Sequence, residues 1–278
     1  MTHIFPRSFS TQYVVIRRAE GVYLYDEDDR AILDGSSGAA VVSLGHGHPR
    51  IVERMRAQAA EVAFTHGFAF VTRPALELAE RLAQHFGDPG ARVLFASGGS
   101  EATETALKLA RVYQLARGFP AKHRIVSRSV SYHGATLGAL SMTGLLGRRR
   151  DFEPLLMQFP RAATPYCYRC PFGLEPVSCA LECAADVERT IVEQGAANVA
   201  AFIVEPVIGA SAPGVNAPRE YLERTAEICR AHDVLLIADE VMSGVGRTGR
   251  FFAMEHWDVQ PDMVVLSKSL SSGYSPLA

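Results

Sequence analysis

Residues 200–206 have the sequence AAFIVEP and residues 234–240 have VLLIADE, so each is an apolar run that ends on a carboxylate. Runs that are apolar at successive positions are typical of strands covered on both faces of a sheet. Residues 92–96 (RVLFA), 124–126 (RIV) and 263–266 (MVVL) share this character. Longer amphipathic stretches lie between the runs. The alternation predicts an α/β fold whose mostly parallel sheet carries helices on both faces.

The helix expected over residues 101–117 has one apolar stripe. Its members are Ala102, Ala106, Leu109, Val112 and Ala116. A second helix is expected over residues 219–232, and residues 74–86 begin a third with Pro74 in the first turn, a favoured place for proline. The earlier chain differs: residues 22–34 (VYLYDEDDRAILD) predict a β-hairpin, and a helix is expected from Pro49. We therefore place a boundary near residues 70–74.

Composition restricts the class of protein. The 278 residues are 48% hydrophobic and 21% charged, with a net charge of −2. This favours one or two globular domains and gives no reason to expect nucleic acid or a membrane as a partner. No apolar stretch has the length of a membrane span, and the first residues lack the order of a signal peptide, so we expect a cytoplasmic protein. Its five cysteines are expected to be free thiols.

Polar residues follow the predicted strands, where ligands bind in open α/β sheets. After residues 92–96 come Gly99 and Ser100, directly before a helix. Free N–H groups of a first helical turn together with a hydroxyl can bind a phosphate. Taken alone, these residues favour an ordinary Ser cap after a glycine turn. After residues 124–126 come Tyr132 and His133, an aromatic ring for stacking and an imidazole.

Carboxylates and an amine complete this set. Glu205 and Asp239 each end an apolar strand, and a buried carboxylate needs a partner, so we expect a cationic one for Asp239. Lys268 follows the last run, where burial can lower the pKa of its amine and make it a nucleophile toward aldehydes. A phosphate site, a stacking ring, a carboxylate and an amine match the four parts of pyridoxal phosphate.

Residues 238–249 (ADEVMSGVGRTG), 251–262 (FFAMEHWDVQPD) and 267–277 (SKSLSSGYSPL) resemble the signature of class III, fold type I, pyridoxal-phosphate aminotransferases. Residues 45–49, 64–70, 97–105, 131–136 and 205–207 extend the resemblance to most of the chain. It implies a fold type I large domain over residues 71–278, with its C-terminal part absent. Residues 1–70 would be an N-terminal segment that forms part of a small α+β domain.

The resemblance also assigns roles to residues. Lys268 would form the Schiff base with the cofactor and move the proton, and Asp239 would hold the ring nitrogen protonated. The other cofactor-binding positions would be Gly99 and Ser100 at the phosphate, Tyr132 over the ring, Glu205 beside the substrate, and His133 and Val241.

The implied reaction transfers an amino group from an ω-amino acid or a primary amine to an oxo acid such as pyruvate or 2-oxoglutarate. The resemblance also implies a homodimer. Aminomutases, decarboxylating transaminases and racemases share these motifs and remain alternatives. A further alternative is a non-catalytic fragment, because family members continue well past the position of Ala278.

Three features fit the resemblance less directly. Met242 stands where many family members carry a hydrogen-bonding Gln. Gly244, Gly246 and Gly249 spell GxGxxG, but the aromatic residues that follow do not favour the long helix of a dinucleotide site. Residues 148–150 (RRR) are interpreted as a solvated basic patch.

Four cysteines lie close together in the sequence as C-x2-C-x8-C-x3-C: Cys167, Cys170, Cys179 and Cys183. This spacing favours free thiols that pack a loop, because the middle segment is short for common zinc sites. Tetrahedral zinc binding by the four thiols is the alternative, and no other metal site is expected.

Overall fold

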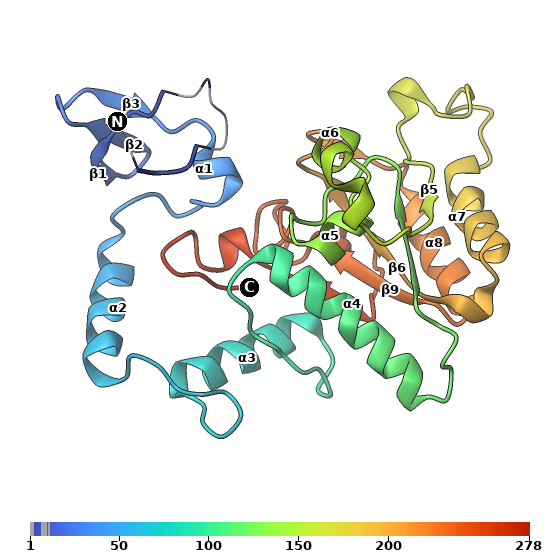
Figure 1. Ribbon diagram of the computed structural model, residues 1–278, viewed down its shortest axis with the longest axis horizontal. Helices are drawn as coiled ribbons and strands as arrows, with labels where there is room; N and C mark the ends of the chain where they lie inside the picture. The colour runs from blue at the N-terminus through green and yellow to red at the C-terminus, as the bar shows by residue number, and fades with distance from the viewer. Residues whose placement is uncertain (1–2, 7–9, 11) are drawn as a thin grey trace. The chain divides into compact units, whose positions relative to one another are not determined.

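The computed structural model describes residues 3–6, 10 and 12–278, and the chain divides into two compact units, residues 1–71 and 72–278 (Figure 1). The first unit holds a three-stranded antiparallel sheet of β1 (Ile16–Glu20), β2 (Tyr23–Asp26) and β3 (Ala31–Leu33). The predicted hairpin over residues 22–34 is confirmed as β2 and β3. Asp26 fixes its turn by accepting hydrogen bonds from the Arg30 backbone N–H at 2.9 Å and from Arg30 Nε at 2.7 Å. The helices of this unit are α1 (Ser37–Ala40) and α2 (Pro49–Glu61).

The second unit is built on a parallel five-stranded sheet with the order β10-β9-β6-β4-β5. Its strands are β4 (Arg124–Arg128), β5 (Arg161–Ala162), β6 (Val199–Val204), β9 (Leu235–Asp239) and β10 (Met263–Val265). Four of the predicted apolar runs therefore form strands. Every residue of β6 and β9 is buried, as expected for strands covered on both faces.

Helices surround this sheet (Figure 1). They are α3 (Arg73–Phe86), α4 (Gly99–Ala116), α5 (Leu137–Met142), α6 (Leu146–Arg149), α7 (Glu182–Glu193) and α8 (Glu220–Ala231). Short 3-10 helices are η1 (Arg150–Leu155), η2 (Cys167–Arg169), η3 (Ala196–Asn198), η4 (Ala253–His256) and η5 (Lys268–Leu270). A small antiparallel pair joins β7 (Val207–Ile208) to β8 (Val215–Asn216). Among the described residues, no helix is long and apolar enough to cross a membrane.

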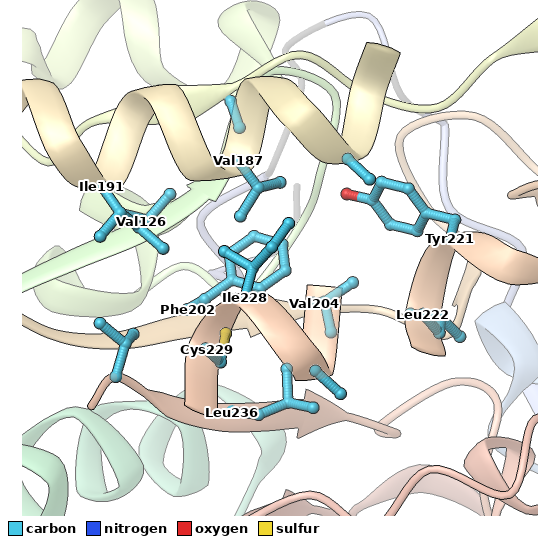
Figure 2. Packing of buried hydrophobic residues seen from close by; sticks show 14 of the residues in the cluster. Val126, Val187, Ile191, Phe202, Val204, Tyr221, Leu222, Ile228, Cys229 and Leu236 are labelled. Atoms are coloured by element: carbon cyan, nitrogen blue, oxygen red, sulfur yellow. The ribbon is translucent and has the colours of Figure 1, made fainter. Parts of the chain in front are cut away.

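Successive residues of the strands belong to two different cores. Phe202 and Val204 of β6 pack with α7 and α8, as Figure 2 shows around Tyr221 and Ile228. Ala201 and Ile203 of the same strand belong to the opposite core, which includes α4 residues. The alternation follows from the two-residue period of a strand, and it confirms that both faces of the sheet are covered.

Residues 92–96 do not form the predicted strand. This segment meets a distant part of the backbone at Ala96, whose N–H donates to the Ala278 carbonyl at 2.9 Å and whose carbonyl accepts from the Ala278 N–H at 2.7 Å. Leu94 is 57% exposed. An apolar run indicates which residues can be buried, whereas a strand also needs a ladder of backbone partners.

The apolar stripe expected on α4 faces the core only at its start, where Ala106 is buried and Ala102 packs against the core; the rest of the stripe lies on the wrong face. The helix buries Thr103, Ala106, Ala110 and Gln114, while Leu109 is 42% exposed. Small residues allow the helix to lie close to the sheet, and Gln114 Nε2 donates to the Ala200 carbonyl at 3.3 Å. The Gln114 Oε1 atom is buried without a hydrogen-bond partner among the described residues, so only the amide nitrogen of this side chain is satisfied in the interface.

Candidate functional site

The carboxyl ends of β4, β6, β9 and β10 and the start of α4 surround one cavity of about 190 Å³. Its lining is Gly99, Ser100, Tyr132, His133, Gly134, Glu205, Ala210, Asp239, Val241, Met242, Ser267 and Lys268. All eight residues singled out from the sequence as cofactor-binding are therefore in one place. This arrangement follows from parallel strands, which end at the same edge of the sheet.

Asp239, the last residue of β9, is paired with His133. The distance from His133 Nδ1 to Asp239 Oδ2 is 2.7 Å, and both side chains are almost fully buried. The Val241 N–H donates to the other carboxylate oxygen at 3.1 Å. Because an ionised carboxylate only accepts, we assign the hydrogen to Nδ1. The expected partner of Asp239 is thus an imidazole, and its Nε2 has no hydrogen-bond partner among the described residues.

Glu205 follows β6 and is buried beside Arg128 of β4. Its carboxylate accepts from the Tyr132 N–H at 3.1 Å, and Arg128 Nη2 lies 3.9 Å from Oε2 and donates to the Glu205 carbonyl at 2.7 Å. Burial raises the pKa of Glu205, while the charges of His133 and Arg128 oppose that rise. Sequence reasoning missed Arg128, although a basic residue at the end of a buried strand is a signal for a buried carboxylate partner.

Lys268 begins the 3-10 helix η5 and has a φ of 45°. A residue with a Cβ atom is uncommon at such a φ, so the surrounding turn must hold Lys268 in place. Burial lowers the pKa of the Lys268 ammonium; the negative charge of Asp239 opposes this effect and the positive charge of Arg247 adds to it. A larger fraction of the amine is therefore unprotonated, and nucleophilic, than in an exposed lysine.

The start of α4 forms a concave backbone site. A Cβ on Gly99 would lie 3.0 Å from a Val241 methyl carbon, so only glycine fits here without displacement. The Ser100 hydroxyl accepts from the Ala135 N–H at 3.0 Å, which leaves its own hydrogen for an acceptor in the cavity. The first N–H groups of a helix have no partner within it, so this end suits an anion.

Glu104, one turn into α4, holds the neighbouring loop and was not predicted. Its carboxylate accepts from the Thr136 hydroxyl at 2.6 Å and from the Ala139 N–H at 2.9 Å. It thereby ties α4 to the N-terminus of α5 and keeps the loop around Gly134 against Ser100. The favourable position of a carboxylate at a helix N-terminus could have indicated this contact only if α5 had been predicted.

Three remaining sequence features supply no hydrogen-bonding group to this cavity. Residues 241–250, which contain the GxGxxG motif, form successive turns rather than the helix of a dinucleotide site. Met242 lines the cavity and offers no hydrogen-bond donor. Arg149 is not part of a solvated patch: it is buried, with Nε 2.9 Å from Glu153 Oε1 and Nη1 2.9 Å from the Thr143 carbonyl.

The five cysteines are free. Within the described part of the chain, no group of three or more His, Cys, Asp or Glu side chains is arranged to hold a metal ion. The structure therefore gives no support to the alternative of a preformed zinc site in the cysteine cluster.

Comparison with known proteins places this site in a family. A model described as "Aminotransferase class-III" matches residues 4–278. The chain is 41% identical over its whole length to the uncharacterized aminotransferase YodT of Bacillus subtilis and spans 62% of that protein. It is 38% identical to the adenosylmethionine-8-amino-7-oxononanoate aminotransferase of Geobacter sulfurreducens over 95% of this chain and 58% of that one.

A solved structure agrees with these relatives. The omega transaminase of Pseudomonas jessenii in complex with PMP matches with a TM-score of 0.93 at 35% identity, over 99% of this chain and 62% of that one. The architecture is therefore that of fold type I transaminases. The chain spans about three fifths of the length of the relatives it matches. Together with the family model that matches almost every residue, these similarities show that the chain belongs to the class III aminotransferases.

Proposed function

We propose that the protein binds pyridoxal phosphate in the cavity around Lys268. We further propose that it transfers an amino group from an ω-amino acid or a primary amine to an oxo acid such as pyruvate or 2-oxoglutarate. One observation carries this proposal. Burial lowers the pKa of Lys268, and this lysine shares a small cavity with the buried Asp239–His133 pair and the N-terminus of α4. Family membership supports it, because the relatives are named as aminotransferases.

The residues present fit this cofactor. The start of α4 with Ser100 offers hydrogen-bond donors for the phosphate, and Gly99 keeps the space open. Asp239 is a buried carboxylate suited to a protonated ring nitrogen, and His133 holds it through the 2.7 Å contact. Tyr132 and Val241 line the same cavity and supply apolar contact for a planar ring.

Pyridoxal phosphate supplies an aldehyde that bonds to amines and a ring that withdraws electrons from the bond to be broken. The Lys268 amine would be the nucleophile for that aldehyde, and it would also take or return a proton at the substrate carbon. Asp239 would hold a protonated ring nitrogen through its negative charge, and the contact with His133 would keep the Asp239 carboxylate in position. The buried Glu205 lies beside the same cavity, where it can orient a polar group of the substrate.

A two-substrate assay tests the reaction. The protein with added pyridoxal phosphate is incubated with β-alanine or a primary amine and with pyruvate, and we expect alanine to form in equal amount to the amine consumed. Lys268→Ala should abolish it. A donor that is isomerised or decarboxylated with no alanine or glutamate formed would contradict transamination and favour the aminomutase or decarboxylase alternative.

The assembly, the location and the domain roles are part of the same proposal. We propose a homodimer, supported by large apolar side chains that α4 exposes, such as Val112 at 59%. Sedimentation that shows only monomer would contradict it. The free cysteines support a cytoplasmic location. Residues 1–70 would contribute to a small domain and residues 71–278 to the cofactor-binding domain.

A further inference from the structure

A second cavity, lined by thiols, lies apart from the cavity around Lys268. Its volume is about 640 Å³, and among the described residues the two cavities share none of their lining. Four cysteines contribute to it: Cys167, Cys170, Cys179 and Cys183. The proposed transamination does not use these thiols, which lie outside the cavity around Lys268.

The backbone places two of the four cysteines, Cys167 and Cys170, at the two ends of one short helical turn. Cys167 is the first residue of the 3-10 helix η2, and Cys170 follows the last. In a 3-10 helix, residues three apart eclipse each other and are separated by one turn, which is about 6 Å between Cα atoms. Disulfides bridge Cα atoms that are roughly 4.4–6.8 Å apart. The turn therefore places the two Cα atoms within the disulfide range. Closing the bond requires the turn to tighten, because the two Cβ atoms must also approach to about 3.5–4.5 Å.

Hydrogen bonds hold this turn on both sides. The Arg169 N–H donates to the Tyr166 carbonyl at 3.0 Å, and the Gly173 N–H donates to the Cys170 carbonyl at 3.1 Å. The second bond fixes the chain directly after Cys170. The alignment of the two thiols is thus part of a defined turn.

Electrostatics and exposure agree with the pairing. Burial raises the pKa of Cys167 most, followed by the negative charge of Cys170 and then by that of Cys179. Cys170 is therefore the thiol that acts most strongly on Cys167. Cys167 is exposed, so a reagent can reach its thiol. Cys170 is half-buried in the same turn, from which its thiol can attack the modified sulfur of Cys167. Burial raises the pKa of both Cys167 and Cys183, and that of Cys183 to about 11. Cys183 is also buried whereas Cys167 is exposed, so access to a reagent is what favours Cys167.

We propose that Cys167 and Cys170 form a redox-active dithiol that a small-molecule disulfide oxidises reversibly to an intramolecular disulfide. The Cys167 thiolate attacks one sulfur of oxidised glutathione, which breaks its S–S bond and releases one glutathione. The Cys170 thiolate then attacks the Cys167 sulfur and releases the second. Two electrons pass from the protein to the oxidant, and the two protein thiol protons end on the two glutathione thiols.

Peptide mapping after oxidation tests this proposal directly. The protein is equilibrated with oxidised glutathione, quenched in acid, alkylated and digested. We expect the loss of two thiols and a single disulfide that joins Cys167 to Cys170, reversed by dithiothreitol. No loss of thiols, or a disulfide that includes Cys179 or Cys183, would overturn the proposal. So would uptake of one zinc ion per chain that protects all four thiols from alkylation.

Two variants separate the pair from its neighbours. Cys170→Ser removes the attacking thiol, so it should retain one glutathione as a stable mixed disulfide on Cys167. Cys179→Ser is the matched control from the same cavity and should still form the Cys167–Cys170 disulfide. Failure of the control to do so would assign the chemistry to Cys179 instead. All of these readouts follow thiols and need no cofactor, so they are independent of the proposed transamination.

Discussion

Glu240 directly follows Asp239, and its burial makes the stability of the fold depend on pH. The side chain accepts from the Ala253 N–H at 2.6 Å and from the Met254 N–H at 2.9 Å, and so fixes the start of η4. Glu240 is only 1% exposed. Burial raises the pKa of its carboxyl to about 7 because the loss of hydration outweighs these two bonds.

The sign and size of the effect follow from this pKa. An unfolded chain loses the Glu240 proton near the ordinary glutamate pKa of 4.5, whereas the raised pKa lets the folded chain keep it until about 7. The folded state binds more protons in this window, so the free energy of unfolding falls as pH rises through it. At about 1.4 kcal/mol for each pKa unit, the loss is about 3 kcal/mol between pH 4.5 and pH 7 and above.

Urea unfolding of the wild type and Glu240→Gln across this pH range measures the loss. The glutamine does not titrate. It destabilises the fold by an amount that does not depend on pH, because its NH₂ group, a donor, faces one of the two backbone N–H groups that donate to Glu240. Other ionisable groups contribute equally to both proteins and cancel in the difference. We therefore expect the wild type to lose about 3 kcal/mol relative to the variant as pH rises. A difference that stays flat, or that moves in favour of the wild type, would show that folding does not raise the pKa of Glu240.

Three further substitutions test the site and the core. Gly99→Ala places a Cβ 3.0 Å from a Val241 methyl carbon. Fluorescence titration should show that pyridoxal phosphate binds the variant more weakly, by about 1 kcal/mol or more. Equal affinity in the variant and the wild type would contradict the proposed phosphate site. His133→Phe leaves Asp239 without its 2.7 Å partner and should lower the free energy of unfolding by about 2 kcal/mol in urea; no loss would show that the pair is not stabilising. Val204→Ala in the fully buried β6 should cost about 2 kcal/mol, whereas the same change at Val177, which is 98% exposed, should cost less than about 0.5 kcal/mol, and similar costs at both would contradict the described core.

The candidate site could be predicted from the sequence because parallel strands end at one edge of a sheet. Glu205, Asp239 and Lys268 are far apart in the chain, yet each follows an apolar run, and that position alone brings them together. The pairing of His133 with Asp239 could not be predicted, since it depends on how the loop after β4 returns over the sheet. The same limit applies to Glu104, whose partner helix α5 is short and has no clear sequence pattern.

Two errors in the predicted fold share a physical cause. Residues 92–96 are as apolar as a strand but have no ladder, and α4 buries Ala110 and Gln114 rather than Leu109 and Val112. Hydrophobicity measures what a side chain gains by burial. It does not state which backbone lies alongside, or how closely a helix approaches a sheet. Those depend on partners distant in the sequence.

Lys268 is the residue that we propose as the nucleophile for pyridoxal phosphate in this cavity. Incubation with pyridoxal phosphate, reduction with borohydride and peptide mapping by mass spectrometry locate the carbon–nitrogen bond directly. We predict one cofactor per chain, fixed on the Lys268 Nζ, and no fixed cofactor in Lys268→Ala. A protein that binds the cofactor with no label on Lys268, or a label that persists elsewhere in Lys268→Ala at the same level, would contradict this account.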